Sequence, residues 1–369
     1  MKILSVVPYK VFPPRTGGQR AIALLERYLA RQVELICITV KSNYSDGAGY
    51  PVLNLLADSP LRYINPFYFF TLRRIIRRQA ITHLLLEHPY YGWLGILLQK
   101  TTGVKLVVRS HNIEATRWKQ LGKWWWKLLY YYEQQVHRSA DYSLFIQEAD
   151  YRFAINRYGV PATRCIVTTY GLEWDAPFPE QEDRAIKAQI RQQHGIAAED
   201  HLFLFNGAFN YGPNLDALNT LVERVNPLLQ QKQGFRYKII VCGMNIPESI
   251  SSGHHPDMII VGFADDISRY FRAADVFLNP VSDGGGIKTK LVEALGYNCN
   301  VVSTANGAIG VDPQWCNGKL WVVDNTDWQA FADAIPLAAG VRAGIPPLFF
   351  KRFYWGNIIH DMLSFIGGA

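Results

Sequence analysis

Cysteine is scarce and unpatterned in this chain. The 369 residues include five cysteines, Cys37, Cys165, Cys242, Cys299 and Cys316, and no C-x-x-C pair occurs among them. Scattered cysteines in odd number indicate buried thiols in a reducing compartment, so we predict a cytoplasmic protein without a disulfide framework. No metal site is predicted either, because the isolated pair His254–His255 has no partner at ligand spacing.

Long apolar runs are also missing. No window reaches the roughly 18 consecutive apolar residues that cross a bilayer. The apolar run within residues 1–8 is too short for a signal peptide and predicts a first strand. No G-x-G-x-x-G motif follows the first strand of either half, which disfavours a dinucleotide-dependent dehydrogenase. Apolar residues make up 49% and charged residues 19%, so we expect a folded protein, long enough for two domains.

Basic residues exceed acidic ones, giving a formal net charge of +7. Such an excess attracts nucleotides, nucleic acids and anionic membranes alike. Arg73, Arg74, Arg77 and Arg78 surround two isoleucines in one predicted helix, and residues 118–132 mix lysines with Trp and Tyr. Basic helices with Trp and Leu on one face lie in membrane interfaces. These segments favour an anionic membrane surface over nucleic acid as a partner, and they leave open a peripheral location on the inner face of a membrane.

The alternative for both segments is an ordinary helix whose aromatic residues pack in the core and whose basic residues face solvent. We favour this alternative for the arginine cluster. For the Trp-rich segment both interpretations stay open.

Short apolar segments alternate with helical patterns in both halves, which indicates parallel sheets covered by helices on both faces. The first half has predicted strands at Lys2–Val7, Val33–Val40, His83–Glu87, Lys105–Ser110, Tyr142–Ile146 and Arg164–Thr169, and helices near Gln19–Arg31, Pro66–Arg78, Gly92–Thr101, Ala115–Arg138 and Ala149–Tyr158. The second half has strands at Leu202–Phe205, Lys238–Cys242, Met258–Val261, Val276–Leu278, Asn300–Ser303 and Leu320–Val323, and helices near Leu215–Leu229, Ile267–Ala273, Ile287–Leu295 and Trp328–Leu337.

We therefore predict an α/β protein of two doubly wound, Rossmann-like domains that face a central cleft. Residues 1–172 form the first domain, to which a single C-terminal helix within 349–369 crosses back, and residues 173–348 form the second. The charged stretch Trp174–Asp200 is predicted to be a linker with a lone helix. Because ligands bind at the carboxyl ends of parallel strands, the loops Pro8–Gly18, Ser110–Glu114, Gly207–Asn214 and Ser282–Lys288 are expected to line the cleft.

The most informative segment is a glycine-rich run between a predicted strand and a predicted helix. Gly284, Gly285 and Gly286 precede a helix that starts with Lys288 and Lys290 and carries Glu293 one turn later. Glycines let the backbone approach a ligand closely, and a helix N-terminus favours an anion. The two lysines indicate a phosphate or diphosphate, and Glu293 is placed to bind sugar hydroxyls. A structural alternative is that Lys290 only pairs with Glu293.

This run, with Val301–Thr304 and Gly307 after it, resembles the C-terminal signature of the retaining GT-B glycosyltransferases of family four. Further segments match that family in order: Leu204–Asn214, Ile239–Gly243, Val261–Phe263 and Tyr270–Pro280 in the second half, and Pro13–Gly18 and Arg109–Glu114 in the first. The resemblance covers nearly the whole chain. It implies transfer of a sugar from a nucleoside diphosphate sugar to a glycan or lipid-linked acceptor, as in polysaccharide biosynthesis, with retained anomeric configuration and without a metal or other cofactor.

The resemblance also implies roles for individual residues. Glu293 would bind the ribose hydroxyls, and Gly284, Gly285 and Gly286 would approach the sugar and the diphosphate. Gly17 and Gly18 would reach the phosphates. His111 would sit beside the transferred sugar, and the leaving diphosphate would help to take the acceptor proton. Gly207 and Asn210 lie in the loop matched to the donor-binding domain.

Two positions depart from the family pattern. Gly285 stands where the family often has a glutamate that contacts the donor sugar, and Asp283 is close enough in sequence to replace that contact. The arginine and lysine that the family commonly has after Leu202–Phe205 are also missing. The charge on the diphosphate is then expected to be balanced by Lys288, Lys290 or Arg15.

Three other functions remain to be weighed against sugar transfer. A nucleotide-sugar epimerase of the same fold would need further acids beside the sugar, and a pyridoxal-type phosphorylase would need a Schiff-base lysine; neither can be assigned. A non-catalytic sugar- or membrane-binding homologue is the third, favoured by the glycine at 285. Glu87 and His88 end a strand at the same sheet edge and rank below His111 as site residues. For Glu114 the alternative is that its negative charge only caps the following helix.

Overall fold

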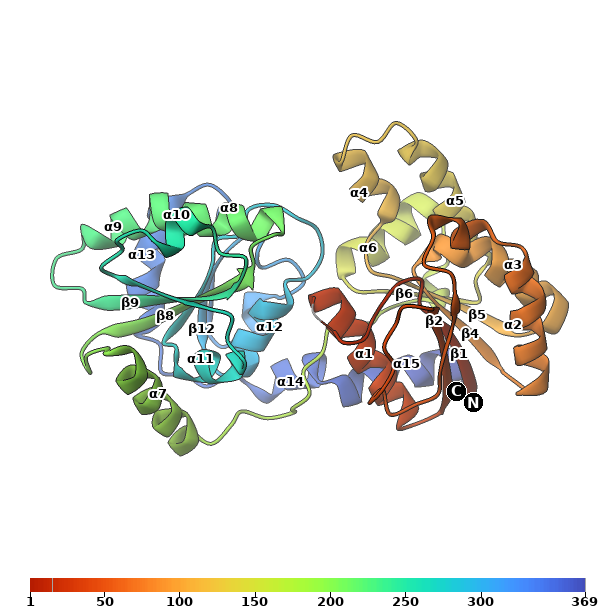
Figure 1. Ribbon diagram of the computed structural model, residues 1–369, viewed down its shortest axis with the longest axis horizontal. Coiled ribbons are helices and arrows are strands. Elements are labelled where there is room, and N and C mark those ends of the chain that lie inside the picture. The colour runs from red at the N-terminus through yellow and green to blue at the C-terminus, as the bar shows by residue number, and fades with distance from the viewer. Residues whose placement is uncertain (15, 369) are drawn as a thin grey trace. The chain divides into compact units, whose positions relative to one another are not determined.

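The computed structural model describes residues 1–14 and 16–368, so Arg15, one of the predicted diphosphate-binding residues, lies outside the described residues. The chain divides into two compact units (Figure 1). Unit 1 comprises Met1–Gly171 together with the chain from Trp355 onward, and unit 2 comprises Leu172–Tyr354. Each unit is described by itself.

Unit 1 is built on a seven-stranded sheet with the order β3-β2-β1-β4-β5-β6-β7, and all its strand pairs are parallel. The strands are β1 (Lys2–Val6), β2 (Glu34–Val40), β3 (Val52–Leu56), β4 (His83–Glu87), β5 (Lys105–Ser110), β6 (Tyr142–Phe145) and β7 (Cys165–Val167). The central strands β4 and β5 are buried along almost their whole length, as expected for a parallel sheet covered on both faces. Strand β3 is not among the predicted strands, because this edge strand is short and largely half-exposed.

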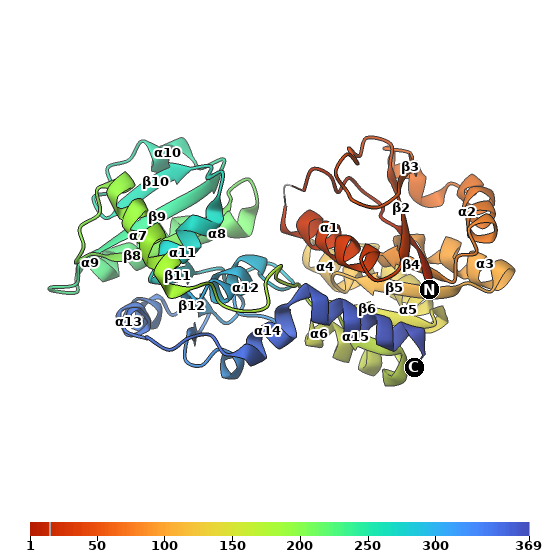
Figure 2. The ribbon, with the colours of Figure 1, turned by 90° about the horizontal axis from the view of Figure 1, so that it is seen from below.

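Helices cover both faces of this sheet (Figure 2). They are α1 (Gly17–Ala30), η1 (Pro60–Ile64), α2 (Phe67–Arg78), η2 (Pro89–Tyr91), α3 (Gly92–Thr102), α4 (Glu114–Gln120), α5 (Trp126–Ser139), α6 (Glu148–Phe153), η3 (Ala154–Tyr158), η4 (Ala162–Arg164) and α15 (Trp355–Gly367). The predicted helix Ala115–Arg138 is two helices, because the chain turns at Gly122, whose φ of +68° ends α4. A left-handed glycine after a helix is a common stop signal.

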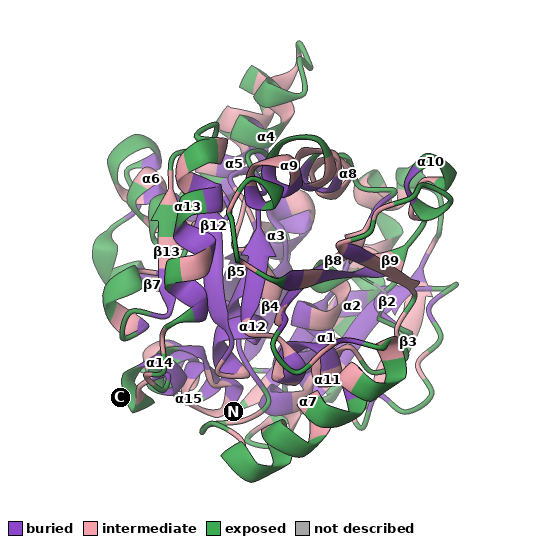
Figure 3. Ribbon diagram, turned by 90° about the vertical axis from the view of Figure 1, so that its left-hand side faces the viewer, coloured by how far each residue is buried: buried purple, intermediate pink, exposed green. Residues whose placement is uncertain are grey.

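Unit 2 has a six-stranded parallel sheet with the order β10-β9-β8-β11-β12-β13. Its strands are β8 (His201–Ala208), β9 (Tyr237–Met244), β10 (Met258–Gly262), β11 (Val276–Asn279), β12 (Asn300–Thr304) and β13 (Leu320–Val323). Its helices are α7 (Glu180–His194), α8 (Gly212–Thr220), η5 (Leu221–Val225), α9 (Asn226–Gln230), α10 (Glu248–Ser251), α11 (Ile267–Ala273), α12 (Thr289–Gly296), η6 (Pro313–Trp315), α13 (Trp328–Ala339) and α14 (Pro347–Phe353). In both units the strands hold much of the buried core (Figure 3).

The C-terminal tail differs from the single helix predicted over 349–366. It is broken at Tyr354, whose extended backbone separates α14 from α15. Helix α14 belongs to unit 2 and contacts α12, whereas α15 belongs to unit 1 and contacts α1 (Figures 1 and 2). Trp355 is fully buried at the start of α15 and packs against Gly171 in unit 1. The tail therefore returns to the first unit, as expected. Among the described helices none combines the length and apolarity that a membrane crossing requires.

Candidate active site

The glycine-rich loop of unit 2 connects the carboxyl end of β11 to the start of α12. Gly284 and Gly286 have φ values of +88° and +75°, a conformation that non-glycine residues rarely adopt. A Cβ on Gly284 would lie 3.1 Å from Tyr211 Oη and 3.2 Å from Pro213 Cγ. The β8–α8 segment therefore packs directly on the loop, and a side chain at position 284 would have to displace it slightly as well as adopt a strained backbone conformation.

Lys288 holds the glycine loop in place. It is the N-cap of α12, and its Nζ donates to the carbonyl oxygens of Gly284 at 2.8 Å, Gly285 at 3.3 Å and Gly286 at 3.0 Å. Burial lowers the pKa of Lys288 to about 8, although the nearby Asp283 carboxylate works in the opposite direction. The ammonium group thus lies at the predicted anion site, but its hydrogen bonds go to the carbonyl groups of the loop and stabilise the loop conformation.

Lys290 reaches from α12 to the carboxyl end of β8. Its Nζ donates to the carbonyl oxygen of Asn206 and to Oδ1 of Asn214, both at 3.1 Å, and it lies 4.9 Å from the ring centre of Phe205. Burial, and then the charge of Lys288, lower the pKa of Lys290 to about 7. The two oxygen acceptors carry no formal charge, so an added anion would stabilise the ammonium form.

The other predicted donor residues occupy different positions around this loop. Glu293 is buried, at 7% exposure, in the middle of α12. Asp283 is exposed and accepts a 2.6 Å hydrogen bond from the N–H of Gly284, so it shapes the turn itself. Gly207 lies within β8. Its carbonyl oxygen is so close to Gly243 of β9 that a Cβ on Gly243 would lie 1.8 Å from it. Asn210 is exposed in the turn after β8.

Two asparagines also support the loop, and the sequence analysis did not single them out. Asn306 donates from Nδ2 to the carbonyl of Gly284 at 3.2 Å. Asn279, fully buried at the end of β11, donates to Ser303 Oγ and to the carbonyl of Gly307. A Cβ on Gly307 would lie 2.5 Å from that Asn279 nitrogen, which explains the glycine after β12.

In unit 1 the predicted residue His111 belongs to a buried group of charges where β4 and β5 end. Glu87 accepts hydrogen bonds from Arg109 Nη1 at 3.0 Å and from His111 Nε2 at 2.5 Å. The parallel register places Glu87 opposite Arg109. Burial alone would raise the pKa of Glu87, because it disfavours the ionised carboxyl. The effects of Arg109 and His111 are larger than that of burial and lower the pKa of Glu87 to about 2. Arg109 has no exposed surface, so Glu87 is its necessary counter-charge.

His111 is a neutral imidazole at physiological pH. Burial, His88 and Arg109 lower its pKa to about 4, against the opposing effect of Glu87. Because Nε2 lies next to the carboxylate, we assign the proton to that nitrogen, which leaves Nδ1 as an acceptor. This fixed tautomer suits a residue that hydrogen-bonds a neutral sugar.

His88, which ranks below His111 as a candidate from the sequence, stacks on His111 in the structure. The ring centres lie 4.2 Å apart. His88 has a φ of +74°, a strained backbone conformation that costs about 1–3 kcal/mol and is typical of functional sites. Tyr9 Oη lies 3.0 Å from its Nε2, and Glu114 Oε1 lies 3.4 Å from its Nδ1. In the sequence, the only indication of a role for His88 is its position directly after an apolar strand, at the carboxyl end where parallel sheets bind ligands.

Glu114 and Glu133 connect this cluster to α4 and α5. Tyr90 Oη donates to Glu114 Oε2 at 2.8 Å, and the pKa of Glu114 is lowered because its histidine and tyrosine partners outweigh burial. Glu133 accepts from the N–H groups of Glu114 and Ala115, both at 3.0 Å. Burial raises the pKa of Glu133 to about 7. The start of α4 is thus anchored by a carboxyl group from α5.

Gly17 and Gly18 start α1 and are exposed. Thr16 caps this helix in a reciprocal capping box with Gln19. Apart from its chain neighbours and its own helix, no atom of the described residues 1–14 and 16–368 lies within 4 Å of a Cβ built on Gly18. The open first turn is compatible with the predicted approach to a phosphate, but the capping box alone also explains the sequence here.

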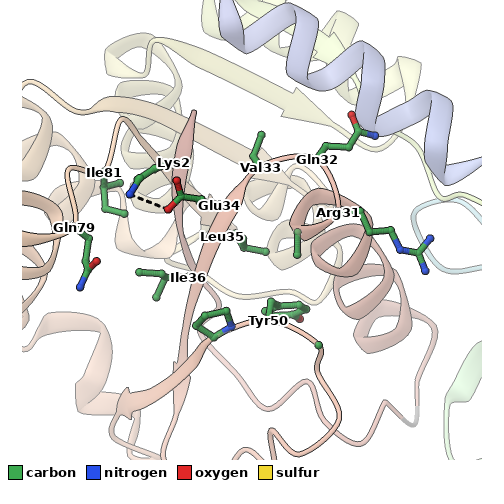
Figure 4. A pocket seen from close by; sticks show the side chains of 13 residues that line it. Lys2, Arg31, Gln32, Val33, Glu34, Leu35, Ile36, Tyr50, Gln79 and Ile81 are labelled. Carbon is green, nitrogen blue, oxygen red and sulfur yellow. Dashed lines mark ion pairs between the residues drawn. The ribbon is translucent and has the colours of Figure 1, made fainter.

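A hollow with a volume of about 630 Å³ lies elsewhere in unit 1 (Figure 4). It is lined at one side by Lys2 and Glu34, which start β1 and β2 and form a 2.8 Å ion pair. This is the amino end of the sheet, opposite the edge where parallel sheets bind ligands. We therefore assign no site to it. Among residues 1–14 and 16–368, no cluster of three or more His, Cys, Asp or Glu side chains could hold a metal ion.

Two family profiles match the sequence. "Glycosyltransferase Family 4" matches residues 15–172, and "Glycosyl transferases group 1" matches residues 200–337. No curated protein matches the sequence closely enough to serve as a relative.

Solved structures of the same fold cover the whole chain at low sequence identity. Anabaena Alr3699/HepE in complex with UDP has a TM-score of 0.74 and 14% identity, with 100% of both chains covered. A glycosyltransferase from Rickettsia africae has a TM-score of 0.72 and 12% identity, covering 100% of this chain and 99% of its own. WaaG, a glycosyltransferase involved in lipopolysaccharide biosynthesis, has a TM-score of 0.64 and 16% identity, covering 100% and 98%. With its two parallel sheets and both family profiles, the chain belongs to the family-four, group-1 glycosyltransferases of GT-B fold.

Proposed function

We propose that this protein transfers a sugar from a nucleoside diphosphate sugar to a glycan or lipid-linked acceptor, with retained anomeric configuration and without a metal. The observation that carries the proposal is Lys290. Its ammonium group is partly buried beside a glycine loop at the carboxyl end of β11, and its pKa is lowered to about 7. A diphosphate at this position would supply the missing negative charge.

The proposal gives each residue of the glycine loop a distinct role. Lys290 binds the diphosphate, while Lys288 holds the Gly284–Gly286 turn open for it. Glu293 binds the ribose hydroxyls. Because Gly285 cannot contact the donor sugar with a side chain, that contact falls to Asp283 or to backbone groups of the loop. Lys290 also replaces the basic residues that the family commonly has after the first strand of its donor domain.

His111 is proposed to hydrogen-bond the transferred sugar through Nδ1. Glu87 and Arg109 fix its orientation, and its pKa of about 4 keeps it neutral through the physiological range. A neutral imidazole is a poor proton donor for the leaving group but a good hydrogen-bond acceptor for a hydroxyl. This supports a mechanism in which the leaving diphosphate itself takes the acceptor proton.

The first experiment is a thermal-shift screen against UDP, GDP, CDP and dTDP. A nucleotide present at 100 times its Kd stabilises the folded protein by about 2.7 kcal/mol, which is visible as a higher Tm. UDP deserves the first trial because Anabaena Alr3699/HepE was solved with UDP-glucose. The matching nucleotide sugars are then assayed for release of the free diphosphate, in the presence and absence of EDTA, and the product anomer is determined by NMR.

Two variants test the site directly. We expect Glu293→Ala and His111→Ala each to lower diphosphate release by about 100-fold, since each removes a hydrogen bond to a bound sugar. Glu223→Ala and His254→Ala are matched controls, because both residues are exposed in unit 2. Diphosphate release that needs EDTA-sensitive metal, or that survives both site variants, contradicts the proposal.

Two alternatives give different results in the same assays. A nucleotide-sugar epimerase would change the sugar without releasing diphosphate. A non-catalytic homologue, suggested by Gly285, would show a thermal shift with a nucleotide but no turnover with any donor.

A further inference from the structure

Unit 1 exposes two apolar, aromatic segments that the proposed sugar transfer does not use. The first, here called the α4–α5 tip, comprises residues 117–131. Trp124 is 83% exposed at its end, and Leu121, Leu128 and Tyr131 are exposed beside it. The tip projects from the body of unit 1 (Figure 1). Trp side chains are large and apolar, so this degree of exposure calls for a partner.

The second segment, here called the η1–α2 face, comprises residues 60–78. Leu61, Ile64, Phe67 and Phe70 are all exposed, with Phe67 at 72%, and they recur at every third position. Leu72 and Ile76 on the other side of α2 are buried in the core. The exposed side chains are thus an additional apolar row and not the packing face of the helix.

Both segments are basic and free of acids. The tip carries exposed Lys119, Lys123 and Lys127, and the η1–α2 face carries exposed Arg74, Arg77 and Arg78. The sequence has no Asp or Glu in residues 115–132 or 59–86. On the tip, Lys119 Nζ lies 4.9 Å and Lys127 Nζ 5.9 Å from the ring of Trp126. Cations and indole rings are therefore interleaved on one surface.

The two segments lie at the same edge of one sheet and are joined by hydrogen bonds. η1 follows β3 and α4 follows β5, so both leave the carboxyl ends of parallel strands. Trp93 connects them: its Nε1 donates to the carbonyl of Tyr63 in η1 at 2.7 Å, and its backbone N–H donates to Tyr132 Oη of α5 at 3.1 Å. Tyr132 Oη in turn donates to the carbonyl of Tyr90.

We propose that unit 1 docks on an anionic lipid bilayer through the α4–α5 tip and the η1–α2 face together. Trp124, Leu128, Phe67 and Phe70 enter the interface, and the lysines and arginines contact the lipid phosphates. The aliphatic side chains favour a bilayer over RNA, because RNA offers stacking surfaces for aromatic rings but no apolar medium for leucine or isoleucine. The absence of acids matches the negative surface potential of such a bilayer.

Vesicle flotation tests this without any nucleotide sugar, so its result is separate from that of the transfer assay. The full chain is expected to float with phosphatidylcholine vesicles containing phosphatidylglycerol, more weakly with pure phosphatidylcholine, and less as salt rises. Trp124→Ser with Leu128→Ser, and separately Phe67→Ser with Phe70→Ser, should each weaken partitioning by about tenfold or more. Leu337→Ser, an exposed leucine of α13 in unit 2, is the matched control and should change nothing.

Thermal unfolding checks that each variant is still folded. Because the substituted side chains are exposed, the Tm should be unchanged or higher. Brominated lipids should quench part of the Trp fluorescence in the native chain and less of it in Trp124→Phe. No flotation with anionic vesicles, or flotation that persists in the tip variant, overturns the proposal. Loss in the tip variant alone overturns the role of the η1–α2 face. Binding of an oligouridine RNA without vesicle binding assigns the surface to nucleic acid instead.

Discussion

Lys290 is expected to take up a proton when a nucleoside diphosphate sugar binds. In the free protein, burial and the neighbouring Lys288 lower its pKa to about 7. A bound diphosphate favours the ammonium form and should return the pKa of Lys290 toward its ordinary value of about 10.4. Between these two pKa values the bound state holds more protons than the free state, so affinity falls as pH rises.

The magnitude follows from the two pKa values. With a pKa of about 7, Lys290 is about 10% protonated at pH 8 in the free protein, so binding should take up about 0.9 proton. From pH 7 to pH 9 the protonated fraction falls from about one half to about 1%. The Kd should therefore rise by up to about 50-fold, which corresponds to about 2.3 kcal/mol. Lys288, with a pKa of about 8, adds about 0.5 proton at pH 8 if the diphosphate contacts it as well.

Calorimetric titration at pH 8 in two buffers of different ionisation enthalpy measures this uptake. Lys290→Met keeps the length of the side chain and removes its charge, so the difference in proton uptake between the native protein and the variant isolates Lys290. Lys238→Met is the control, a lysine of β9 whose Nζ donates to a backbone carbonyl away from the glycine loop. Measurable binding without proton uptake, or the same uptake in Lys290→Met, would refute the assignment of Lys290 to the diphosphate.

Three further predictions concern stability and loop geometry. Glu87→Gln removes the counter-charge of the fully buried Arg109 and should lower the free energy of unfolding by about 3–5 kcal/mol in urea denaturation; an unchanged midpoint would contradict this. Gly284→Ala, at φ +88°, should cost about 1–2 kcal/mol and abolish the nucleotide thermal shift, whereas Gly234→Ala, at φ +72° in open space, should cost stability and keep the shift. Burial raises the pKa of Glu26 to about 7 from 4.5, so its neutral form stabilises the fold below pH 4.5 and that stabilisation is lost as pH rises to 7. Glu26→Gln should then raise the free energy of unfolding by about 3 kcal/mol at pH 8 and by little at pH 5; equal effects at both would count against it.

The apolar pattern predicted most of the fold because parallel strands buried on both faces have little sequence freedom. β4, β5 and β13 have the predicted bounds, and α11 matches to the residue. The errors lie where burial is incomplete or a local conformation decides. The edge strand β3 is half-exposed, and the breaks at Gly122 and Tyr354 depend on single backbone dihedral angles that the helical periodicity around them does not reveal.

For the candidate site, sequence motifs predicted the glycine-rich loop but not the residues from other strands that lie around the candidate site residues. Gly284 and Lys290 stand close in sequence, so spacing alone placed them together. Glu87 and Arg109 are neighbours only because β4 pairs with β5, which no local pattern states. The features that single out His88, its φ of +74° and its stacking on His111, are likewise not readable from the sequence. Residues that are brought together by the strand order, or that are distinguished by backbone strain, can be identified only from the structure.

The Glu87–Arg109–His111 group and the glycine loop differ in how their buried charges are balanced, and this difference predicts which of them makes donor binding depend on pH. In the Glu87–Arg109–His111 group of unit 1 the buried charges are matched: Glu87 lies against Arg109 and His111, and its pKa of about 2 and that of His111 of about 4 lie far below neutrality. That group therefore keeps one protonation state from about pH 5 upward, with or without a ligand. In unit 2, Lys288 and Lys290 have pKa values of about 8 and 7, so their charge responds to an anion. Because the Glu87–Arg109–His111 group does not titrate between pH 6 and 9, we expect the pH dependence of donor binding in that range to come mainly from Lys288 and Lys290 of the glycine loop. A His111→Asn variant that still binds donor should keep the pH profile of the native protein, and a Lys290→Met variant should flatten it.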